Sequence, residues 1–157
     1  MKIDGMMTKD PATCGPDSTL AHAARIMWEA DVGCLPVLDA EGFPIAMITD
    51  RDICMAAYTQ GRALSALHVS SAMSRRLVSV TENAQLADVE TLMQKNQIRR
   101  VPVVDLAGQL VGMVTLGDIA RHSEQQKLRK PIEGLGVAKT LASIVERRSS
   151  QANGGLA

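Results

Sequence analysis

The sequence contains the same seven-residue pattern twice, and this repetition limits the possible folds more than any other feature. Met47 to Ile53 reads MITDRDI, and Met113 to Ile119 reads MVTLGDI, 66 positions later. When the chain is aligned with itself at this offset, twelve identities fall within the 47 positions from Met7 to Ile53, without a gap. A gapless match of this length indicates an internal duplication, so we expect two copies of one structural unit.

Each copy is predicted to begin with an amphipathic helix. The apolar residues at helical spacing are Leu20, Ala23, Ala24 and Met27 in the first copy and Leu86, Val89 and Met93 in the second. Asp17 and Asn83 stand before these runs, and both are of the types that cap helix N-termini. We therefore expect one such helix in each copy, with Asp17 and Asn83 as the caps.

Two strands and a second helix are predicted to follow in each copy. The segments CLPVLDAEGFPIAMIT and RVPVVDLAGQLVGMVT each contain two apolar runs around a turn sequence, at Asp39 to Gly42 and at Asp105 to Gly108. Such runs are typical of a strand, a tight turn and a second strand. The other elements that we expect are helices over about 50–59 and 116–125 and short first strands over 12–14 and 77–80. The repeated unit is therefore β-α-β-β-α.

The composition excludes several classes of function. Lysine plus arginine and aspartate plus glutamate each number 17, so the whole chain has no charge that would attract nucleic acid or an anionic membrane. No apolar run approaches the roughly 20 residues of a membrane-spanning helix, and we see no signal peptide. Cys14, Cys34 and Cys54 form no close pair, which argues against a disulfide framework or a zinc ribbon. We expect reduced core thiols in a cytoplasmic protein.

The doubled pattern resembles a known family. Two β-α-β-β-α units carrying LPVLD…G…MITDRDI and VPVVD…G…VGMVTLGDI resemble tandem cystathionine-β-synthase (CBS) domains, also called a Bateman module. The resemblance implies an α/β (α+β) fold in which both repeats pack as one pseudo-symmetric unit. We expect a first CBS domain at 3–60, a linker at 61–68, a second CBS domain at 69–122, and a tail at 123–157 with an amphipathic helix around Val137 to Val145. Because little else is attached, the chain resembles the stand-alone members of the family.

Each copy has a T-x-x-D sequence at the start of its second helix, and two interpretations of it are open. Thr49 with Asp52, and Thr115 with Asp118, fit a capping box, in which the two side chains satisfy free backbone N–H groups. The same helix start offers N–H groups and partial positive charge to a phosphate. In matching family members the Asp binds a ribose and the Thr faces the phosphate. The resemblance therefore favours ligand binding by the T-x-x-D of at least one copy, in which the threonine and aspartate also cap the helix.

Basic residues distinguish the two copies. Arg99 and Arg100 precede VPVVD in the second copy, and Arg51 lies inside the first T-x-x-D, where the second copy has a glycine. These side chains are either solvated surface charges or phosphate ligands, since arginine makes planar, paired contacts with phosphate oxygens. We expect the two clefts to be unequal. The more important aspartate is Asp52, if Arg99 and Arg100 reach across to the phosphate of the nucleotide that it holds.

The resemblance also implies where an adenine ring would lie. The family lines its adenine slot with backbone and apolar side chains near the first strand of each unit, which points to Ala12 and Val78. Three positions before the threonines, the copies have Ala46 and Gly112. Because glycine lets a ligand approach the backbone closely, Ala46 is expected to narrow the first cleft slightly.

The leading hypothesis is a regulatory protein, not an enzyme. It would sense an adenosine-containing ligand such as AMP, ADP, ATP, NAD or S-adenosylmethionine in the clefts between the two domains. We expect no required cofactor and no metal-ligating residues, and whether magnesium accompanies the ligand stays open. The sequence has no P-loop, GxGxxG or HExxH motif, so a small enzyme is the weakest hypothesis. The family implies a homodimer and a protein target, whose identity stays open. The alternative is a dimeric interaction scaffold with no physiological nucleotide, against which the retained threonines and aspartates argue.

Overall fold

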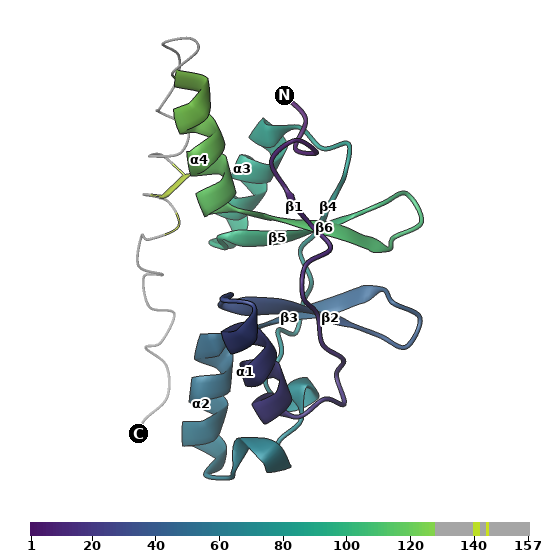
Figure 1. Ribbon diagram of the computed structural model, residues 1–157, viewed down its shortest axis with the longest axis vertical. Helices are drawn as coiled ribbons and strands as arrows, with labels where there is room; N and C mark the ends of the chain where they lie inside the picture. Colours follow the sequence, from purple (N-terminus) through teal and green to yellow (C-terminus); the bar gives the residue numbers. More distant parts are fainter. Residues whose placement is uncertain (128–139, 142–143, 145–157) are drawn as a thin grey trace, which may run out of the picture.

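The computed structural model describes residues 1–127, 140, 141 and 144. The chain forms two stacked halves, whose sheets face each other across the middle of the molecule (Figure 1). The helices lie on the two outer sides, one pair below the lower sheet and one pair beside and above the upper sheet. This is the mixed α/β (α+β) fold of two repeated units that the sequence predicts.

The first half consists of α1 (Leu20–Glu29), β2 (Cys34–Leu38), β3 (Pro44–Thr49) and α2 (Asp50–Gln60). Strands β2 and β3 pair antiparallel, and Asp39 closes the turn between them. Its Oδ1 accepts hydrogen bonds from the N–H groups of Glu41 and Phe43, at 3.1 and 2.8 Å. Gly42 has φ +89°, a conformation that favours glycine. The predicted strand, turn and strand are confirmed here.

The second half repeats this order with β4 (Val80–Thr81), α3 (Leu86–Asn96), β5 (Arg100–Val104), β6 (Leu110–Thr115) and α4 (Leu116–Lys127). Strand β5 pairs antiparallel with β6 and parallel with β4. Asp105 closes the hairpin turn as Asp39 does, accepting from the N–H groups of Ala107 and Gln109 at 2.9 and 2.8 Å. The two hairpin turns lie side by side on one side of the molecule (Figure 1), and a Cβ on Gly108 would lie 3.5 Å from the Phe43 ring.

The caps of the first helix in each half differ from the prediction. Thr19, and not Asp17, caps α1, because its Oγ1 accepts from the His22 N–H at 3.1 Å. Helix α3 begins after Gln85, and not after Asn83, without a side-chain hydrogen bond at its N-cap. In both cases the residue just before the helix forms an antiparallel bridge with the segment at or before the start of the other copy, Thr19 with His68 and Gln85 with Lys2.

The start of each copy packs against the opposite half. Ile3 is fully buried in the core of the second half, and Val69, its equivalent 66 positions later, is fully buried in the core of the first. The main chain follows the same exchange, since the Ile3 N–H donates to Ala84 O and the Val69 N–H donates to Ser18 O. Strand β1 (Thr8–Lys9) continues the exchange by pairing antiparallel with β6. Each half is therefore completed by a segment of the other copy.

The predicted first strands over 12–14 and 77–80 are displaced and shortened. In the first range only Cys14 pairs, through a single bridge to Val37, and β4 begins at Val80, the last residue of the second range. Pro11 and Pro16 flank the first range, and a proline has no N–H group to give to a strand ladder. The four-stranded sheet has the order β1-β6-β5-β4, whereas β2 and β3 form a sheet of two strands.

Each half has its own hydrophobic core. The first core includes Leu20, Ala23, Leu35, Val37, Ile48, Leu67 and Val69, and the second includes Ile3, Val89, Met93, Val101, Val103, Val114 and Ile119. Leu67 is only 2% exposed, so part of the predicted linker 61–68 packs as a core segment of the first half. Cys14 and Cys34 are buried, but Cys54 is exposed on α2, and the expectation of a core position is wrong for this third cysteine.

Two expectations concern the ends of the chain and the membrane. Within the described residues, no helix is both long enough and apolar enough to cross a bilayer. Residues 137 and 145, which bound the predicted amphipathic helix of the tail, lie outside the part of the chain that the structure describes.

Candidate functional site

The first T-x-x-D sequence forms a complete capping box at the start of α2. The N–H and Oγ1 of Thr49 donate to Asp52 Oδ2 at 2.9 and 2.7 Å, and the Asp52 N–H donates to Thr49 Oγ1 at 3.2 Å. Among the described residues, none donates a hydrogen bond to Asp52 Oδ1. Capping therefore uses one carboxylate oxygen of Asp52 and leaves the other available.

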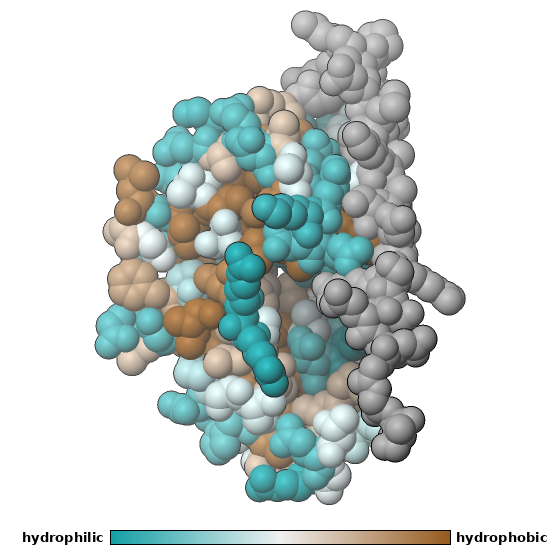
Figure 2. Space-filling view, turned by 180° about the vertical axis from the view of Figure 1, so that it is seen from behind, coloured by the Kyte–Doolittle hydropathy of each residue, from teal (hydrophilic) through white to brown (hydrophobic). Residues whose placement is uncertain are grey.

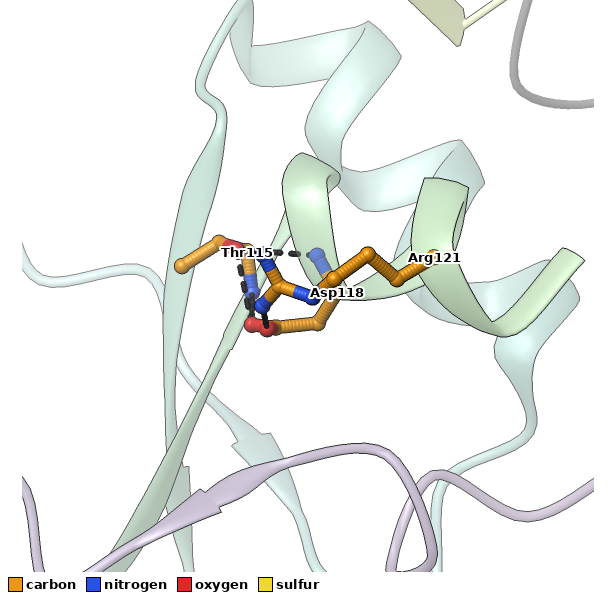
Figure 3. Close-up of polar contacts among 3 residues, drawn as sticks. All are labelled: Thr115, Asp118 and Arg121. Carbon is orange, nitrogen blue, oxygen red and sulfur yellow. Dashed lines mark hydrogen bonds and ion pairs between the residues drawn. The ribbon is translucent and has the colours of Figure 1, made fainter. Parts of the chain in front are cut away.

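The second T-x-x-D sequence caps α4 in the same way (Figure 3). The N–H and Oγ1 of Thr115 donate to Asp118 Oδ2 at 2.8 and 2.7 Å, and the Asp118 N–H donates to Thr115 Oγ1 at 3.1 Å. In this half the guanidinium of Arg121, one turn further along α4, also forms an ion pair with Asp118 Oδ1. Both carboxylate oxygens of Asp118 are therefore engaged.

A cavity of about 490 Å³ opens between the start of α2 and the second half. We call it the first cleft, and its walls include Thr49, Arg51 and Asp52 from the first half and Arg76, Val78, Arg99 and Arg100 from the second. Its volume lies within the range of small-molecule sites, roughly 300–1,000 Å³. The structure thus brings six of the residues nominated from the sequence to one place.

Positive charge dominates the first cleft. Arg51, Arg76, Arg99 and Arg100 line it, and Asp52 is the one carboxylate among the described wall residues. Guanidinium groups bind phosphate oxygens in pairs, and the start of α2 adds N–H groups and partial positive charge. The first cleft is therefore suited to an anion of phosphate-like geometry.

A second cavity, of about 740 Å³, lies at the start of α4, and we call it the second cleft. Its walls include Thr115, Leu116 and Gly117 from the second half and Asp10, Ala12 and Asp31 from the first. Arg99 and Arg100 line this cleft too, but Asp118 is absent from its walls as far as the described residues define them. The carboxylates of Asp10 and Asp31 balance the charges of the two arginines. The second cleft therefore lacks the excess of positive charge found in the first.

Residues at equivalent positions of the two copies explain this difference in charge. Arg76 in the first cleft corresponds to Asp10 in the second, 66 positions earlier, and Arg51 corresponds to Gly117. Each cleft thus combines the T-x-x-D threonine of one half with the strand-entry segment of the other copy, and only the first cleft also includes the aspartate among its described walls. Equivalent positions of the two copies thus line both clefts, but the residues at these positions differ in charge.

Arg100 extends from the second half to the first. Its Nη2 lies 3.2 Å from the position that a Cβ on Gly33 would occupy, and Asp50 Oδ2 lies 3.1 Å from the same position. Cys34 lies beside these groups on the walls of both clefts. Burial raises the pKa of the Cys34 thiol, while Arg100 lowers this pKa and Asp50 raises it. The net increase in pKa keeps the thiol protonated at neutral pH.

The residues three positions before the threonines serve in packing. Ala46 is buried in the first core and is not among the described residues that line the first cleft, so the expectation that it narrows this cleft is wrong. A Cβ on Gly112 would lie 2.8 Å from Met7 Sδ and 2.9 Å from the Thr8 carbonyl oxygen. Gly112 therefore lets a strand of the same chain, β1, approach the backbone closely, in the place where the family resemblance predicts a ligand.

Arg76 is the wall residue that the sequence interpretation missed. It lies two positions before Val78, in a segment whose role depends on its packing against the opposite half. Nearby, Ser74 Oγ accepts a hydrogen bond from the Met47 N–H at 3.0 Å, which fixes this segment to β3. The repeat alignment could have indicated this residue, because Arg76 aligns with Asp10 and both positions flank an expected first strand.

In the described part of the chain, no cluster of three or more His, Cys, Asp or Glu side chains is placed to hold a metal ion.

Comparison with known proteins identifies the family. The CBS domain matches this chain twice, at residues 3–58 and 69–125. The chain therefore belongs to the CBS domain family and is a tandem pair of these domains. Among its relatives, the CBS domain-containing protein YhcV of Bacillus subtilis is 44% identical over 118 residues, which cover 75% of this chain and 82% of YhcV.

Solved structures of CBS domain pairs share this fold. The CBS domain pair of protein MJ0100, in complex with 5′-methylthioadenosine and S-adenosyl-L-methionine, superimposes with a TM-score of 0.73 at 28% identity, covering 81% of this chain and 98% of that one. CBSX2 in complex with AMP gives a TM-score of 0.70 at 25% identity, covering 80% and 98%. Both of these CBS domain pairs were solved with adenosine-containing ligands bound.

Proposed function

We propose that this protein is a regulatory CBS pair that binds an adenosine-containing nucleotide in the first cleft. The observation that carries the proposal is the gathering of four arginines around a helix start that also presents Thr49 and Asp52. An excess of positive charge in a cavity of about 490 Å³ favours a small anion over a neutral metabolite.

Each part of a nucleotide has a matching group in the first cleft. The phosphate suits the arginines and the N–H groups at the start of α2. Ribose hydroxyls suit Asp52 Oδ1, the carboxylate oxygen that capping leaves available. The apolar side chains of Val78 and Ile98 suit the face of an adenine ring. Ala12 occupies the corresponding place in the second cleft.

The solved relatives support the ligand class. MJ0100 was crystallised with two adenosyl compounds and CBSX2 with AMP, and both cover about four-fifths of this chain. The positive charge of the first cleft favours a phosphorylated ligand, such as AMP, ADP, ATP or NAD, over S-adenosylmethionine, which carries a sulfonium and no phosphate.

A nucleotide in the first cleft contacts both halves, and this is the basis of the proposed regulation. Thr49 and Asp52 come from one half, whereas Arg76, Arg99 and Arg100 come from the other. A ligand that binds one arrangement of the halves more tightly shifts the population toward that arrangement, and a partner protein can respond to the change. The competing hypothesis is an interaction scaffold without a nucleotide, in which the T-x-x-D sequences serve only as helix caps.

We also propose a homodimer formed through the outer helices. Trp28 on α1 and Tyr58 on α2 are 88% and 82% exposed, and Met55 on α2 is 45% exposed. These helices lie side by side on the outer side of the first half (Figure 1). A second apolar surface lies on the side of the two hairpins, where Leu106, Phe43 and Ile45 are exposed. Figure 2 shows apolar side chains on the surface of the molecule seen from behind. Light scattering of the wild type and of a Trp28→Ser variant distinguishes the two surfaces. If the dimer forms through the outer helices, the variant is monomeric; if it forms through the hairpins, the variant stays dimeric.

The experiment that tests nucleotide binding is a thermal-shift and calorimetry panel on ligand-free protein. It compares AMP, ADP, ATP, NAD, S-adenosylmethionine and adenosine, with mass spectrometry to establish that no small molecule has co-purified. A ligand at one hundred times its Kd stabilises the folded state by about 2.7 kcal/mol. We expect a shift with at least one phosphorylated ligand and a smaller shift with adenosine. No shift with any ligand at millimolar concentration would favour the scaffold.

A further inference from the structure

The two T-x-x-D aspartates are alike in sequence but differ in what remains free on the carboxylate. In both, Oδ2 accepts from the N–H and Oγ1 of the preceding threonine. In Asp118, the remaining oxygen forms an ion pair with Arg121. In Asp52, the remaining oxygen accepts no hydrogen bond from any residue that the structure describes. Of the two aspartates, only Asp52 therefore keeps a carboxylate oxygen that no described residue contacts through a hydrogen bond.

The difference depends on one position of the repeat. Arg121 lies three residues after Asp118 on α4, and the equivalent residue on α2 is Met55, which cannot form an ion pair. The side chain of Asp118 is only 6% exposed, whereas that of Arg121 is 72% exposed. The guanidinium lies against the carboxylate (Figure 3), and the pair joins a buried aspartate to an arginine that is largely exposed to solvent.

The walls of the clefts show the same difference. Asp52 lines the first cleft together with Thr49. In the second cleft, Thr115 and Gly117 are wall residues, but Asp118 is not among the described residues that line it. A ligand in the second cleft therefore meets the threonine without meeting the carboxylate that would hold a ribose.

We propose that Arg121 is a specificity-determining residue that closes the second cleft to nucleosides by occupying Asp118. This inference rests on the proposed function, since it assumes that a T-x-x-D aspartate holds the ribose. A nucleoside must displace Arg121 before its hydroxyls reach Asp118, whereas no side chain among the described residues has to leave Asp52 Oδ1. The chain therefore binds one nucleotide, in the first cleft, and its second cleft is latent.

A purely structural role for the ion pair makes a different prediction. The pair joins a largely exposed arginine to an aspartate that is only 6% exposed, so removing the arginine leaves a buried carboxylate without this partner. If the pair only supports α4, its removal lowers thermal stability and leaves nucleotide binding as it was. If Arg121 blocks the carboxylate, its removal creates binding at a second site.

The experiment measures AMP binding by calorimetry in variants that isolate one cleft at a time. Asp52→Asn weakens the first cleft, and adding Arg121→Met places at position 121 the residue type that the first copy has at Met55. The mirror variant, Met55→Arg, supplies an arginine three residues after Asp52. Arg62→Met is the control, because Arg62 is exposed and lies outside the walls of both clefts. Circular dichroism establishes that each variant is folded.

We expect D52N to bind AMP at least about tenfold more weakly than wild type, and D52N/R121M to regain binding by about tenfold. M55R should weaken AMP binding in the otherwise wild-type chain, while R62M should leave it unchanged. Equal AMP affinity in D52N and D52N/R121M, with M55R like wild type, overturns the role of Arg121 and leaves the first-cleft proposal intact. Absence of AMP binding in wild type and in every variant overturns both proposals together.

Discussion

Ile3 lies in the core of the second half, and Val69, its equivalent in the repeat, lies in the core of the first. Both side chains are fully buried, and the main chain at each position bonds to the opposite half. The two halves are therefore joined by exchanged segments as well as by side chains that reach across, such as Arg100 beside Gly33. Unfolding of one half removes a core residue from the other, so the pair should unfold as a single cooperative unit.

Replacement of Ile3 by alanine should destabilise the whole pair. Removing a fully buried isoleucine side chain costs about 2–5 kcal/mol, because it deletes apolar contacts and leaves a cavity. Urea unfolding followed by tryptophan fluorescence and by circular dichroism measures the change. Trp28 lies in the first half, whereas the core that contains Ile3 lies in the second. Coincident shifts of both signals therefore show that the two halves unfold together. Lys2→Ala is the control, since Lys2 is exposed. A variant as stable as this control would contradict the exchange.

Gly112→Ala should also destabilise the protein. The added Cβ would lie 2.9 Å from the Thr8 carbonyl oxygen, and this backbone atom belongs to β1, which pairs with β6. Overpacking of this kind costs about 1–3 kcal/mol. Gly5→Ala is a matched control, because nothing lies within 4 Å of a Cβ built at Gly5. Equal midpoints for the two variants in urea would show that β1 moves away from Gly112 at little cost.

Much of the fold could be predicted from the sequence, because the repeat and the periodicity are local signals. The hairpins around Asp39 and Asp105 and the helices after Thr49 and Thr115 lie where apolar alternation and capping residues indicate them. The exchange of Ile3 and Val69 could not be predicted in this way. It depends on which half each strand-entry segment contacts, and a pattern within one copy carries no information about that choice.

The candidate site shows the same limit. Thr49, Asp52, Arg99 and Arg100 were found because they stand out within the repeat alignment, and the structure places them in one cleft. Arg76 was missed because its position in the first cleft follows from the exchanged segments. The engagement of Asp118 by Arg121 depends on a side-chain rotamer, so only the structure reveals it.

The three cysteines should differ in reactivity toward a thiol reagent. Cys54 is exposed, whereas Cys14 and Cys34 are buried. Burial raises the pKa of Cys14 from its ordinary value of 9.0 to about 11, so little thiolate forms at neutral pH. Titration with Ellman's reagent at pH 8 should label one thiol per native chain and three in urea. A Cys54→Ser variant should lose the native reaction, and rapid labelling of this variant would contradict the burial of the other two.

The same burial predicts a loss of stability at high pH. Because folding raises the pKa of Cys14, its contribution to stability is fully present below pH 9 and is lost as the pH rises toward 11. The total effect is at most about 2–3 kcal/mol. Unfolding curves of wild type and Cys14→Ala between pH 8 and 11 isolate this contribution from that of other groups. We expect the wild type to lose stability more steeply than the variant, and parallel curves would contradict the prediction.

Arg76→Gln should weaken the binding of AMP and leave the binding of adenosine nearly unchanged. Arg76 is one of the four arginines of the first cleft, and glutamine retains much of its length without its charge. Loss of a charge-assisted contact to phosphate costs about 1.5–3 kcal/mol, or roughly ten- to a hundredfold in affinity. Asp10→Asn, at the equivalent position of the second cleft, is the matched control and should bind AMP as the wild type does. Calorimetry with AMP and adenosine on both variants checks the prediction, and an equal loss for both ligands would show that Arg76 supports the fold of the cleft without contacting the phosphate.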